Sequence, residues 1–252
     1  MCEDYIATCN NELGEIRNLS DFLRNLRELE DKRAEKERKT ELLFRGQKGD
    51  KTLLPSLARL YGCKPMTGIR KRERLINNEF RRAHIALHTG KPVTTDWELI
   101  SLAQHHGLPT RLLDWSYSPL IALWFAVNSD SDTADLWILD ADVDDFNIED
   151  DLDRSLGKFN KKGRVKILRP LHLTPRITTQ MGVFTVFPLD SAMVGLEINP
   201  RYRKKLYRLK INSKKDVLTI KKELIKLGIN EMLIGQDLDG LCKHLKWRFF
   251  EK

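Results

Sequence analysis

The segment 120–127, Leu-Ile-Ala-Leu-Trp-Phe-Ala-Val, carries no polar side chain on any side. It follows Ser118 and Pro119, a good helix cap and a good first-turn residue, so the segment is predicted to be a helix. A helix that is apolar all round has to be buried. The rest of the chain must therefore supply the elements that enclose it.

Apolar residues at helical spacing predict further helices on both sides of this segment. The clearest has capping-box spacing between Thr95 and Glu98 and stops at Gly107. The predicted helices cover about 20–39, 70–88, 95–106, 217–227 and 239–250.

Short β-rich runs bounded by polar residues predict strands, mostly in the second half of the chain, at 42–44, 136–139, 183–187, 205–211 and 231–234. Gly46 is expected to allow a turn directly after the first strand. The acidic segment 140–153 is expected to be a loop or an insertion. Together these elements predict an α+β fold, in which a helical N-terminal half packs on a mixed, mainly antiparallel sheet.

The 252 residues are enough for one large domain, or for one domain with an appendage. A formal net charge of +8 suits an anionic partner such as a nucleic acid or a phosphate-bearing metabolite, although a solubilising surface explains it more simply. The four cysteines include no C-x-x-C pair, which argues against a zinc site and favours a reducing compartment. No apolar run has the length of a membrane span and no secretory signal is recognisable, so a cytoplasmic protein without membrane contact is expected.

The segment 104–116, Gln-His-His-Gly-Leu-Pro-Thr-Arg-Leu-Leu-Asp-Trp-Ser, concentrates polar side chains between two apolar helical runs. Loops in such positions present side chains to a cleft. His105 and His106 end a helix, and only one of two adjacent helical residues can face a shared site. Ser116 precedes the buried helix, whose N-terminus is a potential anion site. The alternative is loop chemistry, in which Thr110 and Asp114 stabilise turns and Asp114 pairs with Arg111.

Three further positions have both a functional and a structural interpretation. Arg45 directly follows a predicted strand, where its guanidinium can bind a phosphate bidentately or form a salt bridge to Asp114. Gln180 precedes a strand and can bind a ligand or satisfy the backbone at a sheet edge. Asp237 follows the last predicted strand and is the better candidate for chemistry, whereas Asp239 is expected to be a helix N-cap.

Two motifs carry a family resemblance. Phe-Arg-Gly-Gln at 44–47 and the segment 104–116, followed by Ser-Pro at 118–119 and Ala-Leu-Trp-Phe-Ala at 122–126, resemble the FRG domain, named for its Phe-Arg-Gly motif. The resemblance runs from about residue 40 to 245. It divides the chain into an N-terminal helical extension, 1–39, and an FRG domain, 40–252.

A more distant resemblance is to ADP-ribosyltransferases of the Arg-Ser-Glu type, which implies an ADP-ribosyltransferase-like sheet and NAD as the cofactor. It implies catalytic roles for Arg45, Ser116 and a late carboxylate. No Glu-x-Glu pair is present, so Asp237 takes the carboxylate role, with Asp239 and Glu231 as alternatives. The residues expected to contact the cofactor are Gly46, Gln47, His105, His106, Thr110, Arg111, Asp114 and Gln180. No residue is assigned to a metal.

The resulting hypothesis is an NAD-dependent ADP-ribosyltransferase or NAD glycohydrolase that acts as a bacterial or phage-defence effector. Its expected partners are a protein or nucleic-acid target and an antitoxin or regulator. The rival is a non-catalytic nucleotide or nucleic-acid binding module that uses Arg45, Arg111 and the basic surface. A nuclease with His105 or His106 as the acid–base is a third possibility.

Overall fold

A seven-stranded sheet forms the centre of the computed structural model, which describes residues 11–34, 40–61, 66–90, 92–146, 164–170, 178–189 and 194–251. The strand order is β1-β7-β4-β2-β3-β6-β5, and among these pairs only β1 and β7 run parallel. The strands are β1 Glu12–Glu15, β2 Thr40–Lys48, β3 Leu112–Ser116, β4 Ala134–Asp142, β5 Lys166–Leu168, β6 Gly182–Val186 and β7 Leu206–Ile211.

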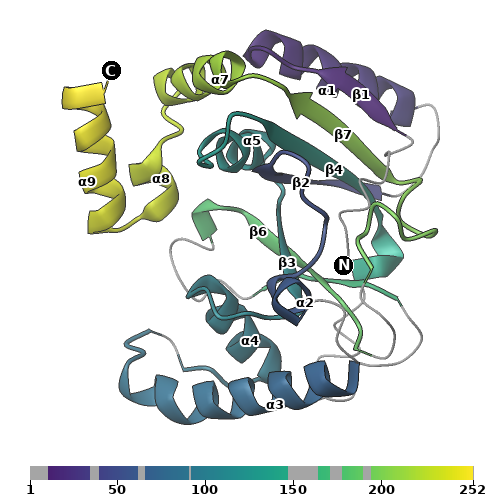
Figure 1. The fold of residues 1–252 in the computed structure, drawn as a ribbon, viewed down its shortest axis with the longest axis vertical. Coiled ribbons are helices and arrows are strands. Elements are labelled where there is room, and N and C mark those ends of the chain that lie inside the picture. Colours follow the sequence, from purple (N-terminus) through teal and green to yellow (C-terminus); the bar gives the residue numbers. More distant parts are fainter. Residues whose placement is uncertain are drawn as a thin grey trace.

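Helices flank this sheet, and the mixture confirms the predicted α+β class (Figure 1). They are α1 Leu19–Ala34, α2 Ser56–Tyr61, α3 Met66–Ala83, α4 Asp96–His105, α5 Pro119–Val127, α7 Lys214–Lys226, α8 Glu231–Gly235 and α9 Leu238–Lys246. Three short turns of helix complete the described elements: η1 His84–Ala86, η2 Val143–Phe146 and η5 Trp247–Glu251.

Helix α5 is the buried helix that the apolar segment predicts. Ser118 caps it by accepting the N–H of Ile121. Its side chains share one hydrophobic core with α1, α7 and one face of β2, β4 and β7, in which Leu123 and Ala126 have no exposed surface. The opposite face of the sheet carries a second core around Leu43, Trp137 and Leu139. The sheet is therefore buried on both faces where β2 and β4 cross its centre.

The predicted turn at Gly46 is wrong, because β2 continues through this residue to Lys48. A Cβ atom at Gly46 would overlap the carbonyl oxygen of Ala122 and the backbone nitrogen of Ala126. Gly46 is needed because α5 crosses β2 at backbone contact distance, and the strand stays regular there.

Three other local predictions are corrected. The segment 112–116, expected to be a loop, is the strand β3, because it pairs with β2 on one side and with β6 on the other. The run at 231–234 is the helix α8, because the Asn230 side chain caps it by accepting the N–H of Leu233. The acidic segment begins with strand, since Asp142 pairs with Thr40, and continues as η2; residues 147–153 lie outside the described residues.

The capping box predicted for α4 is confirmed. The Thr95 hydroxyl accepts the N–H of Glu98, and the Glu98 carboxylate accepts the N–H of Thr95. Burial alone would raise the pKa of Glu98, but the four hydrogen bonds from Thr94 and Thr95 lower it overall. Helix α4 therefore starts at a fixed point, and its last turn reaches the central strands at Gln104.

Candidate functional site

A cavity of about 340 Å³ opens beside the point where β2 and β3 meet. We call it the Arg45 pocket. Phe44 of β2 is in register with Ser116 of β3, so the motifs at 44–47 and 104–116 meet on adjacent strands. The polar groups that line the pocket are those of Arg45, Gln104, His105, Asp114, Ser116 and Gln180. Trp115, Phe125 and Phe184 contribute aromatic surface.

Arg45 is held mainly by uncharged oxygen atoms. Its Nη1 donates to the backbone oxygen of Asp114 over 2.7 Å, and its Nε donates to Oε1 of Gln47 over 3.3 Å. The carboxylate of Asp114 is more distant, with 3.7 Å between Nη1 and Oδ2. Burial lowers the pKa of Arg45 to about 10, while Asp114 raises it and the cation of Arg59 lowers it. Arg45 therefore stays cationic at neutral pH in a largely desolvated position.

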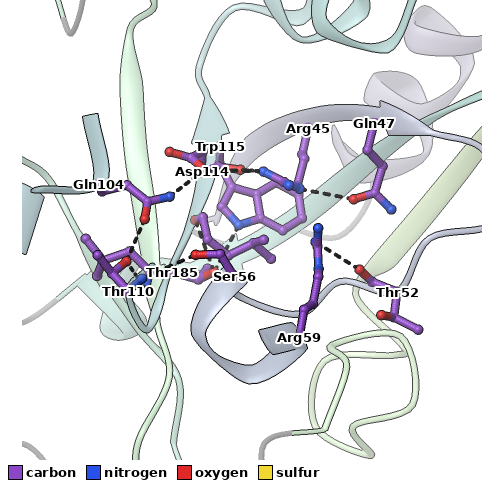
Figure 2. Close-up of polar contacts among 12 residues, drawn as sticks. Arg45, Gln47, Thr52, Ser56, Arg59, Gln104, Thr110, Asp114, Trp115 and Thr185 are labelled. Atoms are coloured by element: carbon purple, nitrogen blue, oxygen red, sulfur yellow. Dashed lines mark hydrogen bonds and ion pairs between the residues drawn. The ribbon is translucent and has the colours of Figure 1, made fainter. Parts of the chain in front are cut away.

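Arg59 is a second cation at this site, and no motif in the sequence assigns it a role. It belongs to the short helix α2, and its Nη2 donates to the backbone oxygen of Thr52 over 3.4 Å. Figure 2 shows its guanidinium pointing towards Arg45 and Gln47. Burial lowers the pKa of Arg59 against the opposing effects of Asp114 and Glu197. Two guanidinium groups thus act on one another near Asp114, an arrangement that favours an anionic ligand.

A chain of hydrogen bonds orients the carboxylate of Asp114. Gln104 Nε2 donates to Asp114 Oδ2 over 2.8 Å, and the Thr110 hydroxyl donates to Oε1 of Gln104 over 2.6 Å (Figure 2). The Thr110 hydroxyl in turn accepts the N–H of Leu112 over 3.0 Å. Because Gln104 sits in the last turn of α4, this chain fixes the helix to the start of β3. The side chain of Asp114 is still 54% exposed, so a ligand can reach it.

Ser116 lines the pocket, but its hydroxyl is engaged on both sides. It donates to the backbone oxygen of Gln180 over 2.7 Å and accepts the N–H of Ser118 over 3.0 Å. The side chain of Gln180 reaches the backbone oxygen of Ile234 over 3.4 Å. These bonds tie β3 and α8 to Gln180, which precedes β6 and lines the pocket.

Arg111, His105 and His106 lie in different surroundings. Arg111 is 1% exposed and is bound through two hydrogen bonds to the carboxylate of Glu73, so it does not pair with Asp114 as the loop interpretation expects. His105 lines the pocket, whereas His106 does not belong to its lining residues. Their rings lie 5.0 Å apart, edge to face.

Asp237 does not belong to the lining residues of the Arg45 pocket. It is the N-cap of α9, where its Oδ1 accepts the N–H of Gly240 over 2.7 Å, and Asp239 follows in the first turn instead of capping. Glu231 faces Lys221, with 3.8 Å between Oε1 and Nζ. The carboxylate that the fold brings to Arg45 is that of Asp114. Arg176, which precedes Gln180 by four residues, lies outside the described residues.

No group of three or more His, Cys, Asp or Glu side chains in the described ranges is arranged to hold a metal ion. Within the same ranges, every helix is too short or too polar to cross a membrane.

Comparison with known families identifies the central part of the chain. Residues 40–135 match the family model described as the FRG domain, so an FRG domain is present in this stretch, which contains Arg45, Gln104, Asp114 and Ser116. Neither the curated proteins nor the solved structures that were compared with the chain include a match. The more distant resemblance to ADP-ribosyltransferases receives no support from these comparisons.

Proposed function

We propose that the Arg45 pocket binds NAD and that the domain cleaves the bond between nicotinamide and ribose, as an NAD glycohydrolase or an ADP-ribosyltransferase. The observation that carries the proposal is the pairing of a desolvated guanidinium, Arg45, with a solvent-accessible carboxylate, Asp114, inside a pocket with aromatic walls. In a bacterial cell, including one infected by phage, such an enzyme would need a regulator or antitoxin to limit its consumption of NAD.

The cationic side of the pocket suits the pyrophosphate. Arg45 uses two of its N–H groups on the protein's own oxygen atoms and keeps its charge, and Arg59 brings a second charge towards it. Guanidinium groups bind phosphate oxygens through paired hydrogen bonds that are stronger than those between neutral groups. Arg45 and Arg59 therefore fit the role of holding the phosphates.

The remaining walls suit a planar ring with polar edges. Trp115, Phe125 and Phe184 offer apolar surface, and the amides of Gln104 and Gln180 are close to it. A volume of about 340 Å³ falls within the range of roughly 300–1,000 Å³ that is usual for small-molecule sites. This size fits one nucleotide half of NAD better than the whole molecule, so the other half would extend into solvent.

The carboxylate supplies the chemistry. When the C–N bond breaks, its electron pair leaves with nicotinamide, and positive charge develops on the ribose. A preorganised negative group beside the ribose stabilises that charge. Asp114 meets this requirement because Gln104 fixes its orientation. Water, or a nucleophile of a target, then forms the new bond to the ribose carbon and loses its proton.

The test is incubation of the folded protein with NAD labelled in the adenylate half, alone and with cellular protein or RNA. Release of nicotinamide is measured by chromatography, and transfer is measured as label on macromolecules. We expect release by the wild-type protein and loss of release in Asp114→Asn, with NAD binding retained. Absence of both free nicotinamide and labelled macromolecules, for a folded wild-type protein, would rule the reaction out.

A second candidate is a non-catalytic nucleotide-binding module. The observation that favours it is the engagement of the polar groups: Asp114 accepts from Gln104, and the Ser116 hydroxyl both donates and accepts. Such a module would bind NAD or a mononucleotide through Arg45 without releasing nicotinamide. Asp114→Asn would then leave binding intact, whereas loss of Arg45 would abolish it.

A further inference from the structure

A second concave surface lies on the other side of α4, between α3 and the first half of α4. This α3–α4 groove has a volume of about 550 Å³. Helix α3 provides one wall through Arg70, Lys71, Glu73, Arg74, Asn77, Asn78 and Arg81. Figure 1 shows α3 at one edge of the molecule, with α4 between it and the sheet. The groove shares no lining residue with the Arg45 pocket.

The wall from α3 is a single helical stripe. Positions 70, 74, 77, 78 and 81 follow the spacing of three to four residues that places side chains on one face of a helix. From Arg70 to Arg81 the stripe extends over about 16 Å, at about 1.5 Å per residue. Cations and amides therefore form a continuous row along the groove. A helix face that is merely solvated would not need such an ordered row.

The charged residues that line the groove divide into paired and unpaired ones. Arg111 is neutralised by Glu73, and Arg81 forms an ion pair with Asp96. Arg70 donates to the uncharged backbone oxygen of Leu189 over 2.5 Å. None of the ion pairs found among the described residues includes Arg70, Lys71 or Arg74. One end of the groove thus carries three positive charges that no carboxylate of the described residues pairs with.

The amides of Asn77 and Asn78 favour a nucleic acid over an acidic peptide as the polyanion that the groove binds. They follow the cations along the same face, and an asparagine amide both donates to and accepts from the edges of bases. An acidic peptide would need only the cations. A double helix presents a convex surface, whereas a concave groove between two helices admits a single flexible strand.

We propose that the α3–α4 groove binds single-stranded nucleic acid, with Arg70, Lys71 and Arg74 on phosphates and Asn77 and Asn78 on base edges. The inference is independent of the reaction in the Arg45 pocket. The described lining contains no aromatic ring on which bases would stack, so binding depends on phosphate contacts and shows little sequence preference. The surface would hold RNA or DNA strands next to the pocket, on the opposite side of α4.

The test is fluorescence anisotropy with a labelled 12-residue oligouridine and, in parallel, a labelled 12-residue oligothymidine, without NAD. We expect wild-type affinity to fall with salt at a log–log slope of about −2, because three phosphates at about −0.7 each are neutralised. The double variant Lys71→Glu/Arg74→Glu should lose more than about tenfold in affinity at low salt, since two phosphate contacts become repulsive. A preference for RNA or for DNA identifies the natural strand, and either supports the proposal.

The matched control is Lys215→Glu/Lys222→Glu on the exposed side of α7, which changes net charge by the same amount at a distant surface. This control and Arg45→Met should both bind the strands within about threefold of wild type. Equal losses in the groove and control variants would mean that only overall charge matters and would overturn the proposal. It would also be overturned by loss of binding in Arg45→Met, by competition from a poly-glutamate peptide as strong as that from the unlabelled strand, or by absence of wild-type binding at low salt.

Discussion

Arg45 and Arg111 both belong to the motifs of the FRG domain, yet the fold uses them in opposite ways. Arg111 is 1% exposed and its charge is neutralised by the carboxylate of Glu73 on α3. Arg45 borders a cavity and is bound chiefly to uncharged oxygen atoms of Asp114 and Gln47. The difference lies in the carboxylate partner. Glu73 is buried with Arg111, whereas the carboxylate of Asp114 lies 3.7 Å from Arg45 and is 54% exposed, so a ligand can reach both groups.

The two arginines also differ in what surrounds them. Arg111 attaches α3 to the start of β3 and thereby positions the α3–α4 groove. Arg45 lies where β2, β3 and α4 meet and has Arg59 close by. A change at Arg111 should therefore act on stability, and a change at Arg45 on binding.

The largest effect is expected for Arg111→Met. It leaves the carboxylate of Glu73 buried and unpaired, which should lower the free energy of unfolding by about 3–5 kcal/mol. Urea denaturation followed by tryptophan fluorescence measures the change. The double variant Arg111→Met/Glu73→Leu should recover most of the loss, because no unpaired charge remains. A loss below about 1 kcal/mol in the single variant would show that Arg111 does not stabilise the fold appreciably.

The second-largest loss of stability is expected for Gly46→Ala. This variant tests whether Gly46, the neighbour of Arg45, is required for packing. The added methyl group meets the backbone of α5, so the free energy of unfolding should fall by about 1–3 kcal/mol or more. Thermal unfolding by circular dichroism detects it. As a control, Gly228→Ala changes a glycine whose added methyl group would meet nothing within 4 Å, although its φ of +86° adds local strain. A Gly46→Ala protein as stable as wild type would contradict the close contact between β2 and α5.

Gln104→Leu tests the orientation of Asp114. It removes the hydrogen bond to the carboxylate but leaves Arg45 in place, so kcat for nicotinamide release should fall about tenfold while KM stays within about threefold. Steady-state kinetics separate the two constants, and the free energy of unfolding serves as the control for a purely structural effect. A change in KM with unaltered kcat would show that Gln104 contributes to binding and has no role in positioning.

The smallest effect concerns the stability of Arg45→Met. Since Arg45 is bonded mainly to neutral groups and is desolvated, its removal should change the free energy of unfolding by less than about 1 kcal/mol. The same urea denaturation compares it with Arg111→Met. If the two variants lost similar stability, the distinction between a structural and a ligand-binding arginine would fail.

The elements predicted correctly are those that the chain specifies locally. The apolar run of α5 and its Ser118 cap, and the Thr95–Glu98 box of α4, need no distant partner to be recognised. Strand β3 was missed because an isolated Leu-Leu-Asp-Trp-Ser segment does not alternate, and only its pairing with β2 and β6 makes it a strand. Helix α8 was missed because a short apolar run fits either element, and the cap from Asn230 decides between them.

The site was predicted in part for the same reason. Arg45 and Asp114 stand out in their motifs, and the strand register brings them together. Gln104 belongs to the segment 104–116 expected at a cleft, but its bond to Asp114 and the approach of Arg59 could not be predicted, since they depend on how α4 and α2 dock on the sheet. The sequence favours Asp237 as the carboxylate because it predicts a strand at 231–234; this segment is instead the helix α8, and Asp237 caps α9.

Isothermal titration of NAD into three folded proteins tests the central claim most directly: wild type, Arg45→Met, and the double variant Arg111→Met/Glu73→Leu. The account predicts one saturable site in the wild type and in the double variant, and binding at least about tenfold weaker in Arg45→Met, because a charge-assisted phosphate contact is worth about 1.5–3 kcal/mol. Equal NAD affinity in Arg45→Met and wild type, or no binding by the folded wild-type protein, would contradict the assignment of the Arg45 pocket as the NAD site.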